Sequence, residues 1–429
     1  MVRHAGRHAS LRHDTGGGRG QRGWGAVRRG RRAVGGPADV RDRGGRVTAA
    51  RSRGAGLTFG LALDLGAPGR SLRQVADGLQ PIVDLAERRR FASLWVGEIY
   101  APTPGAWAAP SSLAMLSWLA ARTTTIGLGT GVLLVPAWHP LRLAYEAAVV
   151  DQLSAGRLTL GVGLGSRELW RRFGRDGVPG ALMDATLNAV RALWTGSDGH
   201  HHDGLDIDGP VHPRPCQAGG PPILVGGLAP AAARRAARFD GWYAATNHHF
   251  GSQLRPAARR YLDALETTDP SKPPKIVVNR MAFAADTTKA ALADGLPYVT
   301  ALLEKYAALG GLVDEDGNPA KPTRDVLARM ADSLCLIGSP ERISEQLAEY
   351  RQAGVTHVNL RVSFGGMPVE LTGRTVNLIA DSVMGQGSSG TADPPGPAAA
   401  AGPVAAARTG RTGERSPDTL EKEPPCQKQ

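Results

Sequence analysis

Two glycine-rich segments follow short apolar runs in this sequence, and their residue types suit the binding of a phosphate group. The first reads GVGLGS and includes Gly163, Gly165 and Ser166, and the second reads ILVGG and ends at Gly226 and Gly227. Backbone N–H groups at a strand-to-helix turn point outward unpaired, and the helix dipole adds partial positive charge there. Glycine lets an anion approach without a Cβ atom in the way. The segments therefore predict a phosphate site, although paired glycines after a strand are also typical of a simple tight turn.

Both glycine corners belong to a repeated alternation of strands and helices. Eight apolar runs are predicted as strands, at 57–64, 94–98, 125–135, 158–163, 222–226, 241–245, 275–284 and 356–362. Helical patterns lie between nearly all of them, and the first helix is expected to begin at Asp77, with Gln80 at the spacing of a capping box. Eight strand–helix units favour an α/β fold, a closed (β/α)8 TIM-type barrel. The alternative is an open doubly wound sheet, but the first strand ends in LALDLGAPGR, which is not a dinucleotide-binding fingerprint.

The predicted barrel domain covers residues 57–385 and carries two insertions. Residues 196–221 are expected to form a hairpin, and residues 285–340 a helical insertion before the last strand. Residues 1–56 are rich in Arg and Gly, and residues 386–429 are rich in Pro, Ala and Gly. Segments of such composition bury too little apolar surface to offset chain entropy, so both are predicted to be disordered tails.

The positive charge of the chain is concentrated in the first tail. The formal net charge is +12, and 14 arginines and three aspartates in residues 1–56 account for +11 of it. The rest of the chain is nearly neutral, so we expect no nucleic-acid partner for the barrel. For the tail, two interpretations stay open. It is either an RNA-binding Arg/Gly arm, or a solvated leader or a start site placed too early in the gene.

Cysteine spacing and hydropathy indicate the compartment. Cys216, Cys335 and Cys426 are widely separated, which supports neither a disulfide framework nor a cysteine-based zinc site, and we expect no metal. No apolar run of about 18 residues is present to predict a membrane span. The N-terminus lacks the apolar core of a secretory signal. These features predict a cytoplasmic protein.

In a (β/α)8 barrel the functional site lies at the carboxyl ends of the strands. That rule selects the following residues: Asp64, Glu98, Thr130, Gly131, Gly163–Ser166, Gly226, Gly227, Trp242, Asn279, Arg280 and Arg361. Glu98 is a candidate acid or base, and a structural hydrogen-bond acceptor is the other interpretation. Arg280 is a candidate for holding a substrate or phosphate anion, with an ion pair to a nearby carboxylate as the alternative. The segment 247–249, Asn-His-His, follows the sixth predicted strand and offers a further candidate histidine for the site.

Five segments, in order, resemble the bacterial luciferase-like monooxygenase family, which also includes flavin- and deazaflavin-dependent oxidoreductases. They are FASLWVGE (91–98), ARTTTIGLGTGVL (121–133), HPLRLAYEAAVVDQLSAGRLTLGVGLG (139–165), PPILVGGLAPAAARRAARFDGW (221–242) and LIGSPERISEQLAEYRQAGVTHVNLRVSFGGMP (336–368). Each motif is loose alone, but five in register are fairly specific.

The resemblance implies a flavin across the barrel mouth, either FMN or the deazaflavin coenzyme F-420. Its phosphate is expected at Gly165, Ser166 and the Gly226–Gly227 pair. The segment 130–132 is expected to press against the flavin ring, where the family often has a cis non-proline peptide. Asp64 and Gly163 complete the expected cofactor contacts. The resemblance also implies a small organic substrate, a separate reductase if reduced flavin activates oxygen, and a homodimer.

One position departs from the family pattern. The family often has a histidine directly after the acidic residue that ends the second strand, and here that position is Ile99. Isoleucine cannot transfer a proton, so Glu98 or Tyr100 is expected to take this role beside Arg280. The sequence therefore predicts a flavin- or deazaflavin-dependent oxidoreductase that performs monooxygenation or hydride transfer. The alternative is a flavin-binding protein with lost or degraded catalysis.

Overall fold

A computed structural model describes residues 56–384, except for 66–68, 101–110, 176, 178, 197–199, 203–204, 208–209, 309–310 and 321–322. The two predicted tails therefore lie outside the described residues, apart from Gly56. Among the described helices, none combines the length and the apolar character needed to cross a membrane.

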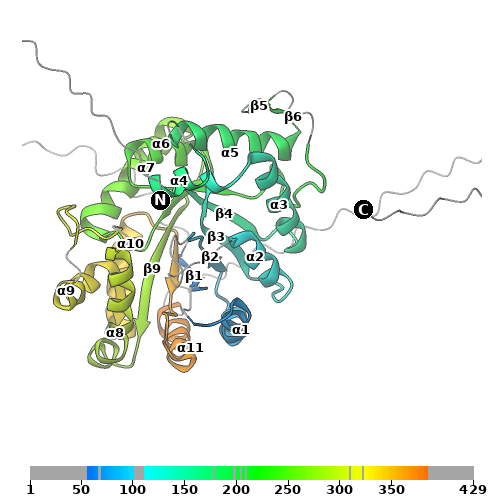
Figure 1. The fold of residues 1–429 in the computed structure, drawn as a ribbon. Coiled ribbons are helices and arrows are strands. Elements are labelled where there is room, and N and C mark those ends of the chain that lie inside the picture. Colours follow the sequence, from blue (N-terminus) through cyan, green and yellow to red (C-terminus); the bar gives the residue numbers. More distant parts are fainter. Residues whose placement is uncertain are drawn as a thin grey trace, which may run out of the picture. The chain divides into compact units, whose positions relative to one another are not determined.

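Eight parallel strands close into a barrel (Figure 1). They are β1 (Thr58–Leu63), β2 (Ser93–Val96), β3 (Gly127–Leu134), β4 (Leu158–Gly163), β7 (Ile223–Gly226), β8 (Gly241–Ala244), β9 (Ile276–Ala284) and β11 (His357–Arg361). Strand β1 pairs with both β2 and β11, and β8 pairs with β9, which completes the circle. Each strand lies within, or within one residue of, a predicted run, so the predicted TIM-type fold is confirmed.

Helices surround the strands and cover their outer faces (Figure 1). They are α1 (Leu72–Arg88), α2 (Ser112–Ala120), α3 (Pro140–Leu153), α4 (Arg167–Arg172), α5 (Pro179–Thr195), α6 (Pro230–Arg238), α7 (Arg255–Thr268), α8 (Thr288–Ala308), α9 (Arg324–Leu334), α10 (Pro340–Gln352) and α11 (Val369–Leu378). Three shorter helical turns are η2 (Val135–Ala137), η3 (Phe250–Leu254) and η4 (Ile379–Met384).

The first helix begins earlier than the sequence analysis expected. Ser71 is the N-cap of α1: its Oγ accepts the Gln74 N–H at 3.2 Å, and Gln74 Oε1 accepts the Ser71 N–H at 2.8 Å. This capping box has the same spacing as the Asp77–Gln80 pair, so the sequence offers two candidate starts. The prediction took the wrong one, and Asp77 lies inside α1.

Both predicted insertions are present in the described residues. The hairpin is formed by β5 (His200–His202) and β6 (Leu205–Ile207), which pair antiparallel. The second insertion contains α8 and α9 and ends in a strand that was not predicted, β10 (Cys335–Gly338). This strand pairs with residues 281–284 of β9, so β9 extends beyond the barrel layer to support the insertion. A four-residue strand directly after a helix leaves little periodicity to detect.

The barrel interior below its mouth is polar and tightly bonded. His357 Nδ1 lies 2.8 Å from Thr58 Oγ1, and His357 Nε2 lies 2.8 Å from Asn359 Oδ1 and 3.0 Å from Ser93 Oγ. Gly60 faces this cluster, where a Cβ atom would lie 2.5 Å from Ser93 Oγ. Burial lowers the pKa of His357 to about 4, so the ring is neutral at pH 7.

Candidate functional site

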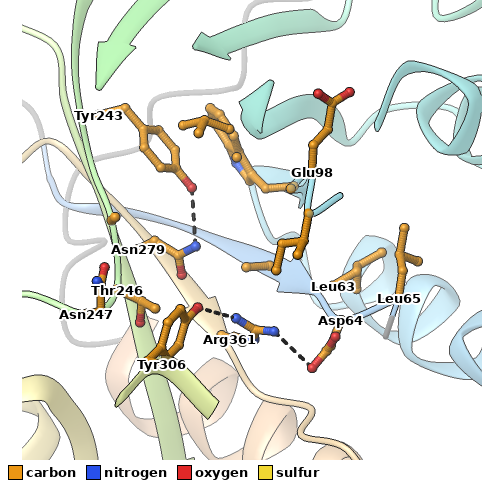
Figure 2. Close-up of a pocket in the computed structure, with 17 residues that line it drawn as sticks. Leu63, Asp64, Leu65, Glu98, Tyr243, Thr246, Asn247, Asn279, Tyr306 and Arg361 are labelled. Carbon is orange, nitrogen blue, oxygen red and sulfur yellow. Dashed lines mark hydrogen bonds and ion pairs between the residues drawn. The ribbon is translucent and has the colours of Figure 1, made fainter. Parts of the chain in front are cut away.

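A pocket opens at the carboxyl ends of the strands, at the position that the fold predicts for a functional site (Figure 2). Its volume is about 180 Å³, several times the roughly 30 Å³ of a water molecule, so it has room for a ring-sized group. Apolar and polar side chains line it: Ala62, Leu63, Asp64, Leu65, Trp95, Gly97, Glu98, Ile99, Gly131, Val132, Tyr243, Ala245, Thr246, Asn247, Asn279, Tyr306 and Arg361.

Strand β3 bulges into this pocket at Val132. The peptide bond between Gly131 and Val132 is cis. The pairing register with β4 shifts there, because Gly131 pairs with Gly161 but Leu133 pairs with Val162. Val132 is thus left out of the ladder and lines the pocket. The cis peptide lies in the segment where the resembled family often has one.

Glycines on the neighbouring strands leave space for the bulge. A Cβ atom on Gly97 would lie 2.9 Å from the carbonyl oxygen of Gly131, and one on Gly163 would lie 2.9 Å from Val132 Cγ2. A Cβ atom on Gly161 would overlap the Thr130 carbonyl oxygen. The chain therefore builds a cradle of glycines around the bulge. Thr130 itself is fully buried, and its hydroxyl donates to the Gly161 carbonyl at 2.8 Å. This bond links β3 to β4.

Glu98 binds the bulge from the side of β2. Its own N–H donates to the Val132 carbonyl at 3.1 Å, and its Oε2 accepts the Leu134 N–H at 3.0 Å. Trp138 Nε1 donates to the same oxygen at 3.3 Å. Oε1 accepts the Ser112 hydroxyl at 2.8 Å and the Ser112 N–H at 3.1 Å. Four donors occupy this buried carboxylate, which leaves little capacity for a substrate proton.

Tyr100 lies beside Glu98 but is not among the residues that line the pocket. Burial, together with the charge of Glu98, raises the pKa of its phenol to about 12. Its ring meets the ring of Phe173 edge-on, with centroids 5.2 Å apart. The structure thus places the two predicted replacements for the family histidine next to one another, with only Glu98 reaching the pocket.

Asp64 and Arg361 form a buried ion pair in the pocket lining, and Figure 2 shows this pair joined to Tyr306. Arg361 Nη2 lies 2.9 Å from Asp64 Oδ2, and Arg361 Nη1 donates to Tyr306 Oη at 2.9 Å. Burial alone would lower the pKa of Arg361, but the Asp64 carboxylate and the Tyr306 phenol raise it above its ordinary value. Asp64, predicted as a cofactor contact, therefore lies in the pocket but is engaged by an arginine. Tyr306 comes from insertion helix α8 and was not predicted.

Asn279, on strand β9, brings a side-chain amide into the pocket. Asn279 Nδ2 donates to Tyr243 Oη at 3.3 Å, and Asn359 Nδ2 donates to the same oxygen at 3.4 Å. Burial raises the pKa of Tyr243 to about 12. Tyr243 thereby joins the pocket to the polar interior of the barrel. A Cβ atom on Gly131 would lie 2.5 Å from Tyr243 Oη, so this phenol packs directly under the bulge.

Arg280, predicted as a catalytic residue, points away from the pocket. Successive residues of a strand face opposite sides, so Asn279 faces the barrel interior and Arg280 the surrounding helices. Arg280 is fully buried; its Nε donates to Tyr350 Oη at 2.7 Å, and its Nη1 to the His248 carbonyl at 2.7 Å. Nη1 also donates to the Thr246 carbonyl at 3.3 Å. Arg280 therefore fixes the loop that follows β8, which includes pocket residues 246 and 247.

The further candidate histidines lie behind the same loop. His249 Nδ1 lies 2.6 Å from Ser333 Oγ, and its Nε2 lies 3.0 Å from the Val313 carbonyl. Burial, with the charge of Arg280, lowers the pKa of His248 to about 4. Neither histidine is among the residues that line the pocket. In the described structure His249 joins the β8 loop to the insertion.

The two glycine corners lie side by side on the rim. Strands β4 and β7 are paired in parallel, with Val162 opposite Val225, so Gly163 and Gly226 follow at the same end of adjacent strands. Gly165 and Gly227 have φ angles of +67° and +124°, values that favour glycine. Ser166 caps α4, its Oγ accepting the Leu169 N–H at 3.2 Å. The structure thus brings together the residues that the sequence analysis assigned to one phosphate site.

The described residues form a closed parallel barrel of the TIM type, with a pocket at the strand ends and a bulge in the third strand. The chain belongs to the luciferase-like monooxygenase family, whose family model matches residues 57–357.

Particular relatives include both flavin- and deazaflavin-dependent proteins. The oxygenase component of a flavin-dependent trigonelline monooxygenase from Acinetobacter baylyi is 28% identical over 221 residues, which are 50% of this chain and 61% of that protein. An F-420-dependent glucose-6-phosphate dehydrogenase from Kineococcus radiotolerans is 26% identical over 335 residues, 70% of this chain and 91% of that protein. The solved monooxygenase RslO1 from Streptomyces bottropensis is 26% identical with a TM-score of 0.66, covering 77% of this chain and 99% of that one.

Proposed function

We propose that this protein binds reduced FMN at the barrel mouth and uses it to oxygenate a small organic substrate. The observation that carries the proposal is the Val132 bulge, which projects into the pocket from a cradle that Cβ atoms on Gly97 or Gly163 would fill. A cradle of this kind suits a flat ring pressed against β3. The trigonelline relative is named as the oxygenase component of a flavin-dependent monooxygenase, and RslO1 is named as a monooxygenase. Both names support the oxygenase reaction.

Each part of the site would hold a different part of the cofactor. Val132 and Gly131 would contact the ring, and backbone N–H groups around Gly165 and Gly226 would hold the phosphate. Ser166, which caps α4, would stand beside that phosphate. Bound reduced flavin would supply the electrons that activate dioxygen.

The pocket walls favour chemistry in a dry site. Leu63, Leu65 and Ile99 line the side of the pocket near β1 and β2, and Val132 lines the side of β3. Apolar walls exclude water from a reacting group and prevent its premature hydrolysis. We propose that Glu98 serves this site by holding the bulge in place. Its four donors make it a positioning residue in preference to a proton shuttle.

A partner must supply the reduced flavin. The first strand is followed by no nicotinamide-binding fingerprint, and the trigonelline relative is named as an oxygenase component. We therefore propose that a separate flavin reductase serves this protein, which we expect to act as a homodimer.

Hydride transfer with coenzyme F-420 is the second candidate. The relative that is named as F-420-dependent matches over 91% of its length, further than the trigonelline relative does. A third outcome, flavin binding without turnover, is the alternative suggested by Ile99 in the place of the family histidine.

Titration of the full chain with FMN and with coenzyme F-420, followed by fluorescence, separates these candidates. The proposal predicts saturable quenching by FMN, and oxygen consumption with reduced FMN that increases with substrate. Preferential binding of F-420 would replace it with the hydride-transfer reaction. Binding of neither cofactor would contradict both.

A further inference from the structure

One corner of the pocket holds buried oxygen atoms without hydrogen-bond partners. Asn279 is 8% exposed, and its Oδ1 has no partner among the described residues, although its Nδ2 donates to Tyr243. Figure 2 shows this oxygen directed away from Tyr243 and toward the Tyr306–Arg361 pair. The Thr246 hydroxyl, in the same lining, also has no partner in the part of the chain that the structure describes. Because buried polar groups are nearly always hydrogen-bonded, these atoms point to a ligand with a polar group.

Tyr306 supplies the complementary donor. Arg361 Nη1 donates to Tyr306 Oη at 2.9 Å, and a guanidinium group can only donate, so the phenol oxygen is the acceptor in this bond. The phenol's own proton is therefore available to a second acceptor. Tyr306 lines the pocket, and its exposure is intermediate. A donor and an acceptor from two different elements, α8 and β9, thus meet in one corner.

The charges around this corner favour an uncharged ligand. Asp64 lies 2.9 Å from Arg361, and both side chains are less than a tenth exposed. An anionic ligand would compete with Asp64 for the arginine, and a cationic ligand would compete with Arg361 for the carboxylate. Either would break a buried ion pair, which is strongly unfavourable.

We propose that Asn279 and Tyr306 together bind the hydroxyl group of an uncharged ring compound, so that the substrates of this protein are phenols and related ring alcohols. A hydroxyl group can donate to Asn279 Oδ1 and accept from Tyr306 Oη at the same time, whereas an ether or a carbonyl can only accept. The ring lies against the apolar wall formed by Leu63, Leu65 and Ile99, which leaves Val132 to the flavin. This assignment rests on the proposed function, because it names the substrate class of the same pocket.

Three matched probes test the assignment: 4-ethylphenol, 4-ethylanisole and 4-ethylbenzoate. Calorimetric titration of the full chain, with and without FMN, is expected to show that 4-ethylphenol binds at least about tenfold more tightly than 4-ethylanisole, which lacks the donor. The anion 4-ethylbenzoate is expected to bind more weakly still. Equal affinities, tighter binding of the benzoate, or no binding of the phenol at millimolar concentration would overturn the proposal.

Two variants locate the effect. Tyr306→Phe and Asn279→Leu are each expected to reduce the preference for 4-ethylphenol over 4-ethylanisole to about twofold or less. Tyr298→Phe is the matched control, because Tyr298 lies on the same helix and packs against the apolar cluster of the insertion. It is expected to keep the full preference. Tyr306→Phe removes one oxygen at a partly exposed position, so it tests the proposal even if Asn279→Leu fails to fold.

The outcome for FMN is measured separately, so the two proposals fail in different ways. Preference for the phenol without any FMN binding would keep the hydroxyl site and contradict the flavin reaction. FMN binding without preference for the phenol would do the reverse.

Discussion

Glu98 Oε2 accepts the backbone N–H of Leu134 at 3.0 Å, across the bulge that places Val132 in the pocket. The Glu98 N–H donates to the Val132 carbonyl on the same bulge. Glu98, two residues past the end of β2, therefore holds β3 at two points, the Val132 carbonyl and the Leu134 N–H. The acidic residue that the sequence offered as a candidate acid or base, or as a structural acceptor, accepts four hydrogen bonds in the described structure.

Replacement of Glu98 by glutamine should destabilise the protein. An amide offers one acceptor oxygen where the carboxylate offers two, so at least one buried donor, at Leu134 or Ser112, loses its acceptor. We expect a loss of about 1–3 kcal/mol in the free energy of unfolding. FMN affinity should fall at the same time, because the bulge loses its support. Urea unfolding and fluorescence titration measure the two effects.

Glu146→Gln is the control for this change. Glu146 forms an ion pair with exposed Arg142, and such surface pairs contribute about 0–1 kcal/mol. If Glu98→Gln is as stable as the wild type and only turnover is lost, Glu98 acts in proton transfer and the geometric account is wrong.

Replacement of Gly97 by alanine should disturb the cofactor site with little effect on the rest of the barrel. The new Cβ would lie 2.9 Å from the Gly131 carbonyl oxygen, so the bulge must move. We expect FMN affinity to fall by about tenfold or more, equivalent to roughly 1.4 kcal/mol, while circular dichroism stays unchanged.

Gly78→Ala is the matched control, since Gly78 lies inside helix α1 and a Cβ there would meet only the end of Arg70 at 3.6 Å. Alanine in a helix interior stabilises by roughly 0.5–1 kcal/mol relative to glycine. Unaltered FMN affinity in Gly97→Ala would show that the bulge does not contact the flavin.

The strands were predictable from sequence because parallel strands buried on both faces form continuous apolar runs. All eight barrel strands were found in this way. The missed strand, β10, is four residues long and follows a helix without a break, so neither length nor a turn marks it. The start of α1 was ambiguous because Ser71–Gln74 and Asp77–Gln80 both have capping-box spacing.

Replacement of Arg280 by lysine should lower stability without affecting recognition of the flavin phosphate. Arg280 donates to Tyr350 Oη and to the carbonyls of residues 246 and 248, and an ammonium group cannot reach all of these acceptors. We expect a loss of about 1–3 kcal/mol in unfolding free energy. The ratio of FMN to riboflavin affinity, which isolates the phosphate, should stay the same.

Exposed Arg259, which pairs with Asp263 one helical turn away, provides the control Arg259→Lys, which should leave stability nearly unchanged. A selective loss of FMN affinity in Arg280→Lys, with normal stability, would restore the predicted anion-binding role of Arg280.

Acid should destabilise the folded protein through its buried histidines. The pKa of His357 is lowered from 6.5 to about 4 in the folded state, and that of His248 is lowered similarly. Below about pH 6.5 the two histidines therefore bind protons in the unfolded chain but stay neutral in the folded chain. Stability is complete above about pH 6.5 and falls as the pH decreases toward 4, by up to about 3 kcal/mol for each histidine. Urea midpoints between pH 8 and 4.5 measure this, and a flat profile would contradict the buried, neutral state of His357.

The site was only partly predictable from sequence, for reasons of direction and distance. Asn279 and Arg280 both follow from the strand-end rule, but neighbouring residues face opposite sides, and the arginine chosen was the outward one. Tyr306 lies in an insertion that no strand-end rule covers, and its partner Arg361 is 55 residues further along the chain. The glycine corners, by contrast, are visible in the sequence because positive φ angles and close backbone approach favour glycine, and their role as a phosphate site stays a prediction.

The most direct test of the account is a crystal structure of the full chain with FMN. The account predicts that the flavin ring lies against Val132 and that its phosphate is within hydrogen-bond distance of the backbone N–H groups around Gly165 and Gly226. A flavin bound away from the β3 bulge, or a phosphate on another part of the rim, would contradict it.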